Sequence, residues 1–148
     1  MAQEPRIIKH VDSGNAYFSI LWSEIKKAEK YDIVRSVPSI SGIFELYFMD
    51  DHKKLNLFFL SKAYYGGLKN EIRRCTDTEL EKDANRKKIL DKYDIYYRWV
   101  PSDSYADLTD ILYFFSCTYF PNNKKHDHSG RYIDIFVEEK NTGKLVDV

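Results

Sequence analysis

The spacing of hydrophobic residues divides the chain into helical and extended segments. Residues 15–31 place apolar side chains at helical intervals, which predicts a helix with one apolar face. That face carries Phe18, Leu21, Trp22, Ile25 and Ala28. Residues 42–49 and 54–60 are dense in aliphatic and aromatic residues, and the polar stretch 50–53 separates them. This pattern predicts a β-hairpin with a loop of about four residues.

Helical spacing returns after the hairpin. Leu68, Ile72 and Cys75 indicate a short helix, and residues 76–79 have the form of a capping box, which predicts a fresh helix start. A basic helical segment around residues 85–93 follows. Residues 94–100 are rich in aromatic and β-branched side chains, which predicts a third strand that Pro101 closes.

The last third of the chain predicts one long helix and one strand. Residues 105–120 form the longest apolar helical stretch, with Ser102, Asp103 and Ser104 as N-cap candidates. Residues 121–130 have loop composition, and residues 131–139 alternate in a strand pattern. The predicted order is α-β-β-α-α-β-α-β, which favours an α+β fold. Its antiparallel or mixed sheet would contain the hairpin 42–60, the strand 94–100 and an extra strand 131–138, flanked by helices.

Length and charge narrow the classes of protein. The 148 residues suit a single domain, 1–148, and the 23 basic residues balance the 23 acidic ones. Nucleic-acid binding would therefore need a local basic patch. Residues 62–98 supply the best candidate patch, although interleaved acidic residues also suit a solvated helical face. Aromatic residues make up 16% of the chain, which suits a core edge, an interface or a site.

The cysteines and the apolar runs predict a location. Cys75 and Cys117 are too few for a disulfide framework and have no CxxC spacing, so we expect reduced thiols. The first ten residues lack the apolar core of a signal peptide, and no run approaches the ~20 apolar residues of a membrane helix. We expect a soluble, cytoplasmic protein with no membrane partner.

The glycine pair in the stretch Ala63–Asn70, AYYGGLKN, raises the question of phosphate binding. It lacks the frame of a P-loop and of a dinucleotide motif. Gly66 and Gly67 therefore favour a strand-to-helix joint with positive φ and close backbone approach. The free N–H groups of a helix N-terminus there could still receive a phosphate.

Acidic and histidine clusters offer candidate metal ligands. His126-Asp127-His128 and Asp50-Asp51-His52 lie in predicted loops, where either a shared ion or local turn hydrogen bonding explains them. Asp107 and Asp110 are three residues apart on the long helix and could hold Mg²⁺ for phosphodiester hydrolysis. In the alternative, Asp107 caps the helix and Asp110 is solvated.

A family resemblance joins several of these segments. Gly42-Ile43-Phe44, the hairpin, Phe59-Leu60-Ser61, a helix with Arg73, a third strand and a helix with Asp110 follow one another. This order resembles the GIY-YIG nuclease domain over residues 37–123, with an N-terminal helix and a C-terminal strand as additions. The resemblance implies a β-β-α-β-α core. It also implies one-metal DNA hydrolysis, in which a tyrosine acts on the water, an arginine on the phosphate and an acid on Mg²⁺ or Mn²⁺.

Several motif positions depart from the family pattern. Phe44 and Phe59 lack the tyrosine hydroxyls, Ser61 replaces a glycine, and Asp110 replaces a glutamate. A second register uses Tyr64-Tyr65-Gly66 as the second motif and shifts the arginine to Arg74. The sequence therefore predicts a divergent GIY-YIG-like protein.

The candidate roles divide between two hypotheses. In the nuclease, Tyr64 or Tyr65 supplies the hydroxyl, Arg73 contacts phosphate and Asp110 holds the metal. The alternative is a degenerate, non-cleaving module with the same fold that binds DNA, a protein partner or a second copy of the chain.

Overall fold

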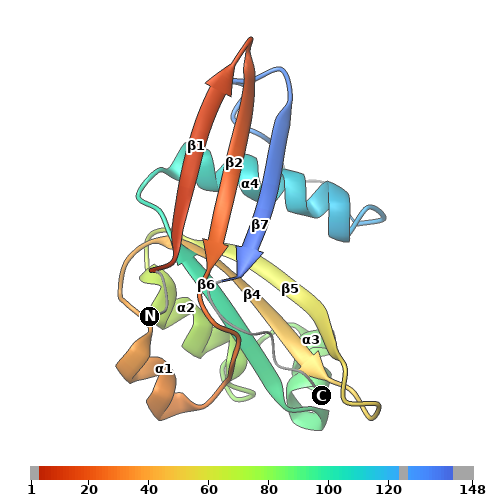
Figure 1. Cartoon of the computed structure of the whole chain (residues 1–148). Helices are drawn as coiled ribbons and strands as arrows, with labels where there is room; N and C mark the ends of the chain where they lie inside the picture. Colours follow the sequence, from red (N-terminus) through yellow and green to blue (C-terminus); the bar gives the residue numbers. More distant parts are fainter. Residues whose placement is uncertain (1–3, 124–126, 142–148) are drawn as a thin grey trace.

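The computed structural model describes residues 4–123 and 127–141 (Figure 1). The strands are β1 (Arg6–Asp12), β2 (Asn15–Trp22), β3 (Lys26–Lys27), β4 (Gly42–Met49), β5 (Leu55–Ala63), β6 (Ile95–Pro101) and β7 (Ile135–Asn141). The helices are α1 (Lys30–Ser36), α2 (Gly67–Thr76), α3 (Ala84–Lys92) and α4 (Tyr105–Tyr119). The strands form two sheets, of order β1-β2-β7 and β3-β6-β4-β5, so the predicted α+β class is confirmed. Within the described residues no helix is long and apolar enough to cross a membrane.

The predicted helix over residues 15–31 is wrong, because its first half is strand β2. Ala16, Phe18, Ile20 and Trp22 are each at most 2% exposed and alternate with more exposed neighbours, which is the period of a strand. Phe, Ile and Trp fit a pleated surface that is buried on one face. The apolar residues between positions 18 and 28 match a helical spacing by coincidence, because some belong to β2 and the others to the segment that follows it. A helix begins only at Lys30.

Strand β1 was not predicted, and it forms a tight hairpin with β2. Asp12 pairs with Asn15, so the turn consists of Ser13 and Gly14, whose φ angles are 53° and 83°. Two central residues with positive φ match the twist of a two-residue hairpin. The predicted strand 131–138 begins later, at Ile135, and pairs in parallel with β2. It therefore belongs to a separate sheet from the hairpin 42–60.

The hairpin of β4 and β5 is confirmed, and β6 pairs antiparallel with β4 on the other side. Its turn is held by Asp50, whose Oδ1 accepts hydrogen bonds from the backbone N–H of His52 at 2.9 Å and of Lys54 at 3.0 Å. Local hydrogen bonding therefore accounts for Asp50 in this turn. From β4 to α4 the elements run β-β-α-α-β-α.

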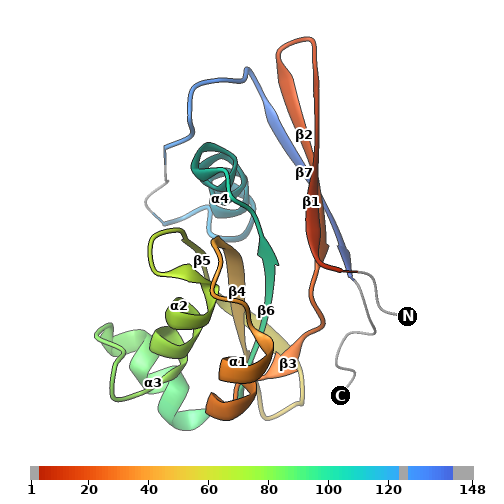
Figure 2. The same cartoon turned by 90° about the vertical axis from the view of Figure 1, so that its left-hand side faces the viewer.

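Two hydrophobic clusters hold the layers together. One lies between α4, the inner face of the β1-β2-β7 sheet and part of the second sheet, with Trp22, Ile43, Leu108 and Phe115 at its centre. The other packs α1 and α2 on the opposite face of the second sheet. Figure 2 shows α4 on the inner side of the first sheet and the other three helices beside the second.

At the helix N-termini, two predictions are wrong and one is confirmed. Residues 76–79 do not open a helix, because α3 begins at Ala84 with Asp83 as its N-cap. The predicted cap of the long helix at Ser104 is confirmed, since its hydroxyl accepts the N–H of Asp107. Asp107 is therefore not the cap.

A buried charge network connects the two sheets. Arg98 of β6 donates from Nε to Glu45 of β4 at 2.6 Å and contacts Glu139 of β7 at 3.3 Å. Glu139 also accepts the indole N–H of Trp22 at 2.9 Å. Burial raises the pKa of Glu45, and the positive charge of Arg98 opposes that shift. The network fixes the register between the sheets, because a buried charge needs its partner in place.

Candidate functional site

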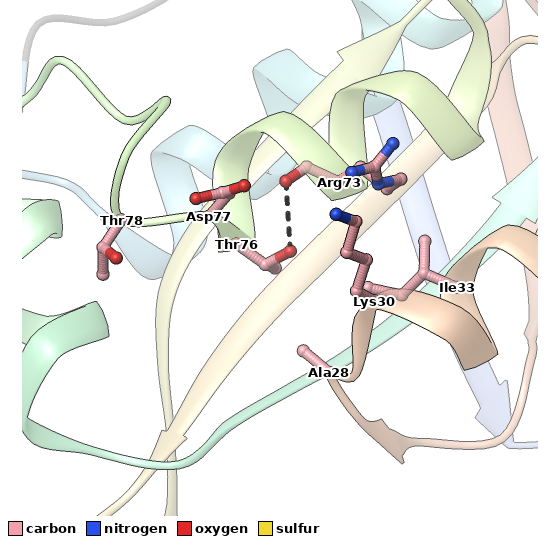
Figure 3. Close-up of a pocket in the computed structure, with 7 residues that line it drawn as sticks. All are labelled: Ala28, Lys30, Ile33, Arg73, Thr76, Asp77 and Thr78. Atoms are coloured by element: carbon pink, nitrogen blue, oxygen red, sulfur yellow. Dashed lines mark hydrogen bonds between the residues drawn. The ribbon is translucent and has the colours of Figure 1, made fainter.

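A hollow of about 200 Å³ lies where the last turn of α2 meets the start of α1 (Figure 3). It is lined by Ala28, Lys30, Ile33, Arg73, Thr76, Asp77 and Thr78. Helix α2 packs on the second sheet through Leu68, Ile72 and Cys75, which turns Arg73 toward α1. Arg73, predicted from sequence as the phosphate-contacting residue, is therefore the one candidate site residue that lines this hollow.

Two cations converge on the hollow without an acidic partner. Figure 3 shows the side chains of Lys30 and Arg73 extending from α1 and α2 toward one another. Neither forms an ion pair with a carboxylate among the described residues, whereas neighbouring Arg74 pairs with Glu71 at 2.9 Å. Two like charges in one hollow favour an anionic ligand.

The polar lining of the hollow is partly committed to the protein itself. Thr76 donates its hydroxyl to the carbonyl of Ile72 at 2.7 Å, which ties it to the helix. Asp77 accepts the N–H of Glu79 at 2.9 Å. The two cations keep unused hydrogen-bond donors, whereas the charge of Asp77 in the same hollow opposes the binding of any anion.

Tyr64 and Tyr65 lie in an exposed tyrosine cluster together with Tyr105 of α4. Their ring centroids are 5.2 Å apart between Tyr64 and Tyr65 and 5.1 Å between Tyr64 and Tyr105, and both contacts are edge-on. Tyr65 is 91% exposed. Lys62 holds its amino group 4.1 Å from the centroid of Tyr105 and donates to Thr109 at 2.9 Å. This tyrosine cluster offers open ring faces beside a positive charge.

The phenols of Tyr64 and Tyr65 lie in different surroundings from Phe44. Phe44 is completely buried, in the cluster between the second sheet, α1 and α2. The rings of the tyrosine cluster are instead exposed on the surface, next to the start of α4. The rings of Tyr64 and Tyr65 therefore lie at the surface, whereas the side chain at position 44 lies in the core.

Asp110 is buried in an ion-paired network on the other side of α4. Its carboxylate accepts from the Ser129 N–H at 2.7 Å, from the Ser129 hydroxyl at 2.8 Å and from the Arg131 guanidinium at 2.8 Å. Asp110 has no exposed surface, so the alternative that it is solvated is wrong. Arg131 also contacts Asp107 at 2.8 Å, and Lys9 contacts Asp107 at 2.9 Å. Burial alone would raise the pKa of Asp107, but hydrogen bonds from Arg131 and Lys9 outweigh burial and lower it.

The surroundings of Asp110 do not suit a magnesium or manganese ion. Such an ion needs open oxygen ligands and keeps several waters, whereas this carboxylate is enclosed and a guanidinium lies 2.8 Å away. No group of three acidic, histidine or cysteine side chains that could hold a metal occurs within the described part of the chain. His126 lies outside the described residues.

The four site residues predicted from sequence lie in three places. Of the hydrogen bonds, ion pairs and ring contacts that these described residues make, only the Tyr64–Tyr65 ring contact joins two of them. Arg73 faces α1, while Asp110 faces the segment before β7. On α4, Tyr105 contacts Tyr64, which follows β5, whereas Asp110 is bound by Ser129, which precedes β7.

Sequence reasoning missed Lys30 and Arg131. The apolar spacing of residues 15–31 predicts one helix, so the sequence does not indicate the turn that starts α1 and directs Lys30 toward α2. Arg131 was assigned to a strand, and its role depends on a contact with a residue 21 positions away. The residues around Arg131 in the sequence do not indicate that it contacts a residue so far along the chain.

The thiol of Cys75 is not activated. Cys75 is buried in the cluster under α2, and burial raises its pKa to about 11. A thiolate is therefore not favoured at neutral pH. Cys117 is partly exposed, and both thiols are free, as predicted.

A family model described as "Uncharacterised protein" matches residues 6–147. The chain therefore belongs to this family. No curated protein and no solved structure shows a significant match.

Proposed function

We propose that this protein is a non-catalytic binding module that contacts the phosphate backbone of DNA through Lys30 and Arg73. The observation that carries the proposal is the pair of cations without acidic partners in one hollow, within the described chain. Phosphate oxygens are the strongly negative, multiply accepting groups that such a pair binds best.

The order of elements supports a GIY-YIG-like core, and the residues at the motif positions argue against catalysis. The run β-β-α-α-β-α from β4 to α4 follows the β-β-α-β-α order of the resemblance, with α3 added. Phe44 offers no hydroxyl for proton transfer, a step worth ~10²–10⁴-fold in rate. Asp110 is occupied by Ser129 and Arg131. Binding therefore fits these residues better than hydrolysis.

The tyrosine cluster suits a second contact of the same ligand class. Exposed aromatic rings stack on unpaired bases, each worth ~1–3 kcal/mol. Tyr65 is 91% exposed, and the partly buried amino group of Lys62 lies over the Tyr105 ring, so an open ring lies close to a positive charge. This contact predicts a preference for DNA with single-stranded or branched segments over plain duplex.

Fluorescence anisotropy with labelled single-stranded, branched and duplex DNA tests the proposal. Two phosphate contacts predict a slope of log K against log salt of about −1.4 to −1.8, or an affinity loss of roughly tenfold between 50 and 200 mM salt. Lys30→Ala/Arg73→Ala should remove most of this slope. Lys87→Ala/Lys88→Ala on α3 is the matched control, because it removes the same charge from exposed positions away from the hollow.

Two results would overturn the proposal. One is the absence of binding to all three DNAs at 50 mM salt, and the other is an equal loss of affinity in both double variants. Incubation of the same DNAs with Mg²⁺ or Mn²⁺ tests the predicted nuclease. Metal-dependent cleavage that a folded Asp110→Asn variant lacks would favour the enzyme over the binding module.

A further inference from the structure

The outer face of the β1-β2-β7 sheet carries an exposed apolar surface. Its register rows place His10, Tyr17 and Phe136 side by side, with Ile8 one row away. Ile8, Tyr17 and Phe136 are 53%, 40% and 45% exposed, and the two rings stack with centroids 5.2 Å apart. These side chains line a shallow hollow of about 250 Å³. We call these four residues and their neighbours on the sheet the outer face.

Among the described residues no helix covers this face. Figure 2 shows α4 on the inner side only, where Phe18, Ile20 and Trp22 are buried. A sheet normally buries one face and exposes a polar one, so stacked aromatic and aliphatic side chains on the open face are unusual. A contiguous apolar surface with a polar rim is typical of a protein–protein contact.

The charges at the two ends of the outer face are opposite. Arg6 pairs with Leu21, which pairs with Lys140, so one end is basic. Asp12 pairs with Asn15 at the other end, and Asp134 donates its N–H to the Asn15 side chain there, so that end is acidic. All four charged residues are exposed. Within the described chain, Lys140 lies 3.9 Å from Glu138, and the other three form no ion pair.

We propose that the outer face is the interface of a symmetric homodimer, with the strands of the two copies antiparallel. A two-fold axis across the strands lays the basic end of each copy on the acidic end of the other, twice per dimer, and stacks the apolar centres. The parallel arrangement would put like charges together. In the antiparallel orientation, the charges of one copy are therefore complementary to those of a second copy. For this reason we infer that the outer face binds a second copy of the chain.

This proposal does not rest on DNA binding, because Lys30 and Arg73 lie beside the second sheet. Its strongest test exploits the predicted contact of Arg6 with Asp12 of the other copy. Arg6→Glu alone and Asp12→Arg alone each create two like-charge contacts in a homodimer. An equimolar mixture of the two variants instead restores two opposite-charge contacts in a heterodimer.

Sedimentation equilibrium of the full chain from 1 to 100 μM gives the readout. We expect a wild-type dimer, a dissociation constant raised at least about tenfold in each single variant, and recovery of dimer in the mixture. Phe136→Asp should give a monomer, and Lys88→Glu on α3 should leave the dimer unchanged. Far-UV circular dichroism confirms that each variant is folded.

Each contrary outcome overturns the proposal. A wild-type monomer at 100 μM removes the dimer. A dimer that withstands both Arg6→Glu and Phe136→Asp uses another surface. Singles that weaken the dimer without recovery in the mixture exclude the antiparallel arrangement.

Discussion

Replacing Asp110 by alanine separates an anchoring role of this carboxylate from a metal-binding one. Its side chain has no exposed surface and accepts three hydrogen bonds of 2.7–2.8 Å from Ser129 and Arg131. These contacts tie the segment before β7 to α4. If they anchor the segment, their loss destabilises the fold.

The size of the effect follows from the surroundings. Hydrogen bonds to a charged group contribute ~1.5–3 kcal/mol each, which sets a lower sum of about 4.5 kcal/mol for three. Ser129 and Arg131 are exposed, so water satisfies them after truncation, and Arg131 keeps its contact with Asp107. We therefore expect a loss of about 3 kcal/mol in the free energy of unfolding, close to the lower end measured for broken buried pairs. The melting temperature should fall by about 6–12 °C.

Urea unfolding followed by tryptophan fluorescence measures this loss, because Trp22 is completely buried and lies in the cluster that α4 covers. Asp110→Asn keeps one oxygen acceptor and should lose roughly half as much. Asp103→Ala, at an exposed position just before α4, should stay within about 0.5 kcal/mol of wild type. An Asp110→Ala protein as stable as wild type, or more stable, would refute the anchoring role. It would fit a metal ligand instead, because removing a buried carboxylate that lacks its metal relieves a desolvation cost.

Two further perturbations test local features. Gly67→Ala should cost about 2 kcal/mol, because φ is +80° and the added methyl would lie 2.9 Å from the Ser39 carbonyl oxygen. Gly66→Ala, where the nearest atoms are 3.9 Å away, should be neutral in the same urea assay; equal costs at both positions would contradict this. Asp107→Asn should lower the free energy of unfolding by about 1 kcal/mol at pH 7 and by nearly nothing at pH 2. Because the folded pKa of Asp107 is lowered, its contribution is present above about pH 4 and is lost as pH falls further, so a pH-independent difference would refute it.

Local sequence signals predicted strands β4, β5 and β6 and helices α2 and α4. The dense apolar runs flanking Asp50 formed β4 and β5, and the Ser104 cap opened α4. At Gly67 the predicted positive φ and close backbone approach are confirmed, whereas Gly66 has φ of −91°. Each of these features depends on residues within a few positions of one another, so composition and spacing carry the information.

The first sheet could not be recognised in the same way. Residues 15–22 fit both a helical and a strand period, and only pairing with β1 and β7 selects the strand. Strand β1 precedes β2 by the two-residue turn Ser13-Gly14, whereas β7 lies far along the chain, so a local window contains only one of the two partners. The α+β class survived this error because one helix was exchanged for strands in a fold that keeps both kinds of element.

The candidate residues themselves came from the sequence, but their grouping did not. Spacing singled out Tyr64, Tyr65, Arg73 and Asp110 as chemically capable side chains. The packing of α2 on the sheet turned Arg73 toward Lys30, and the pairing of β7 with β2 brought Arg131 to Asp110. The sequence alone determined which groups can carry charge or stack, because that is a property of each side chain. Only the tertiary structure decided which of them meet and which charges stay unpaired, because those contacts depend on elements far apart along the chain.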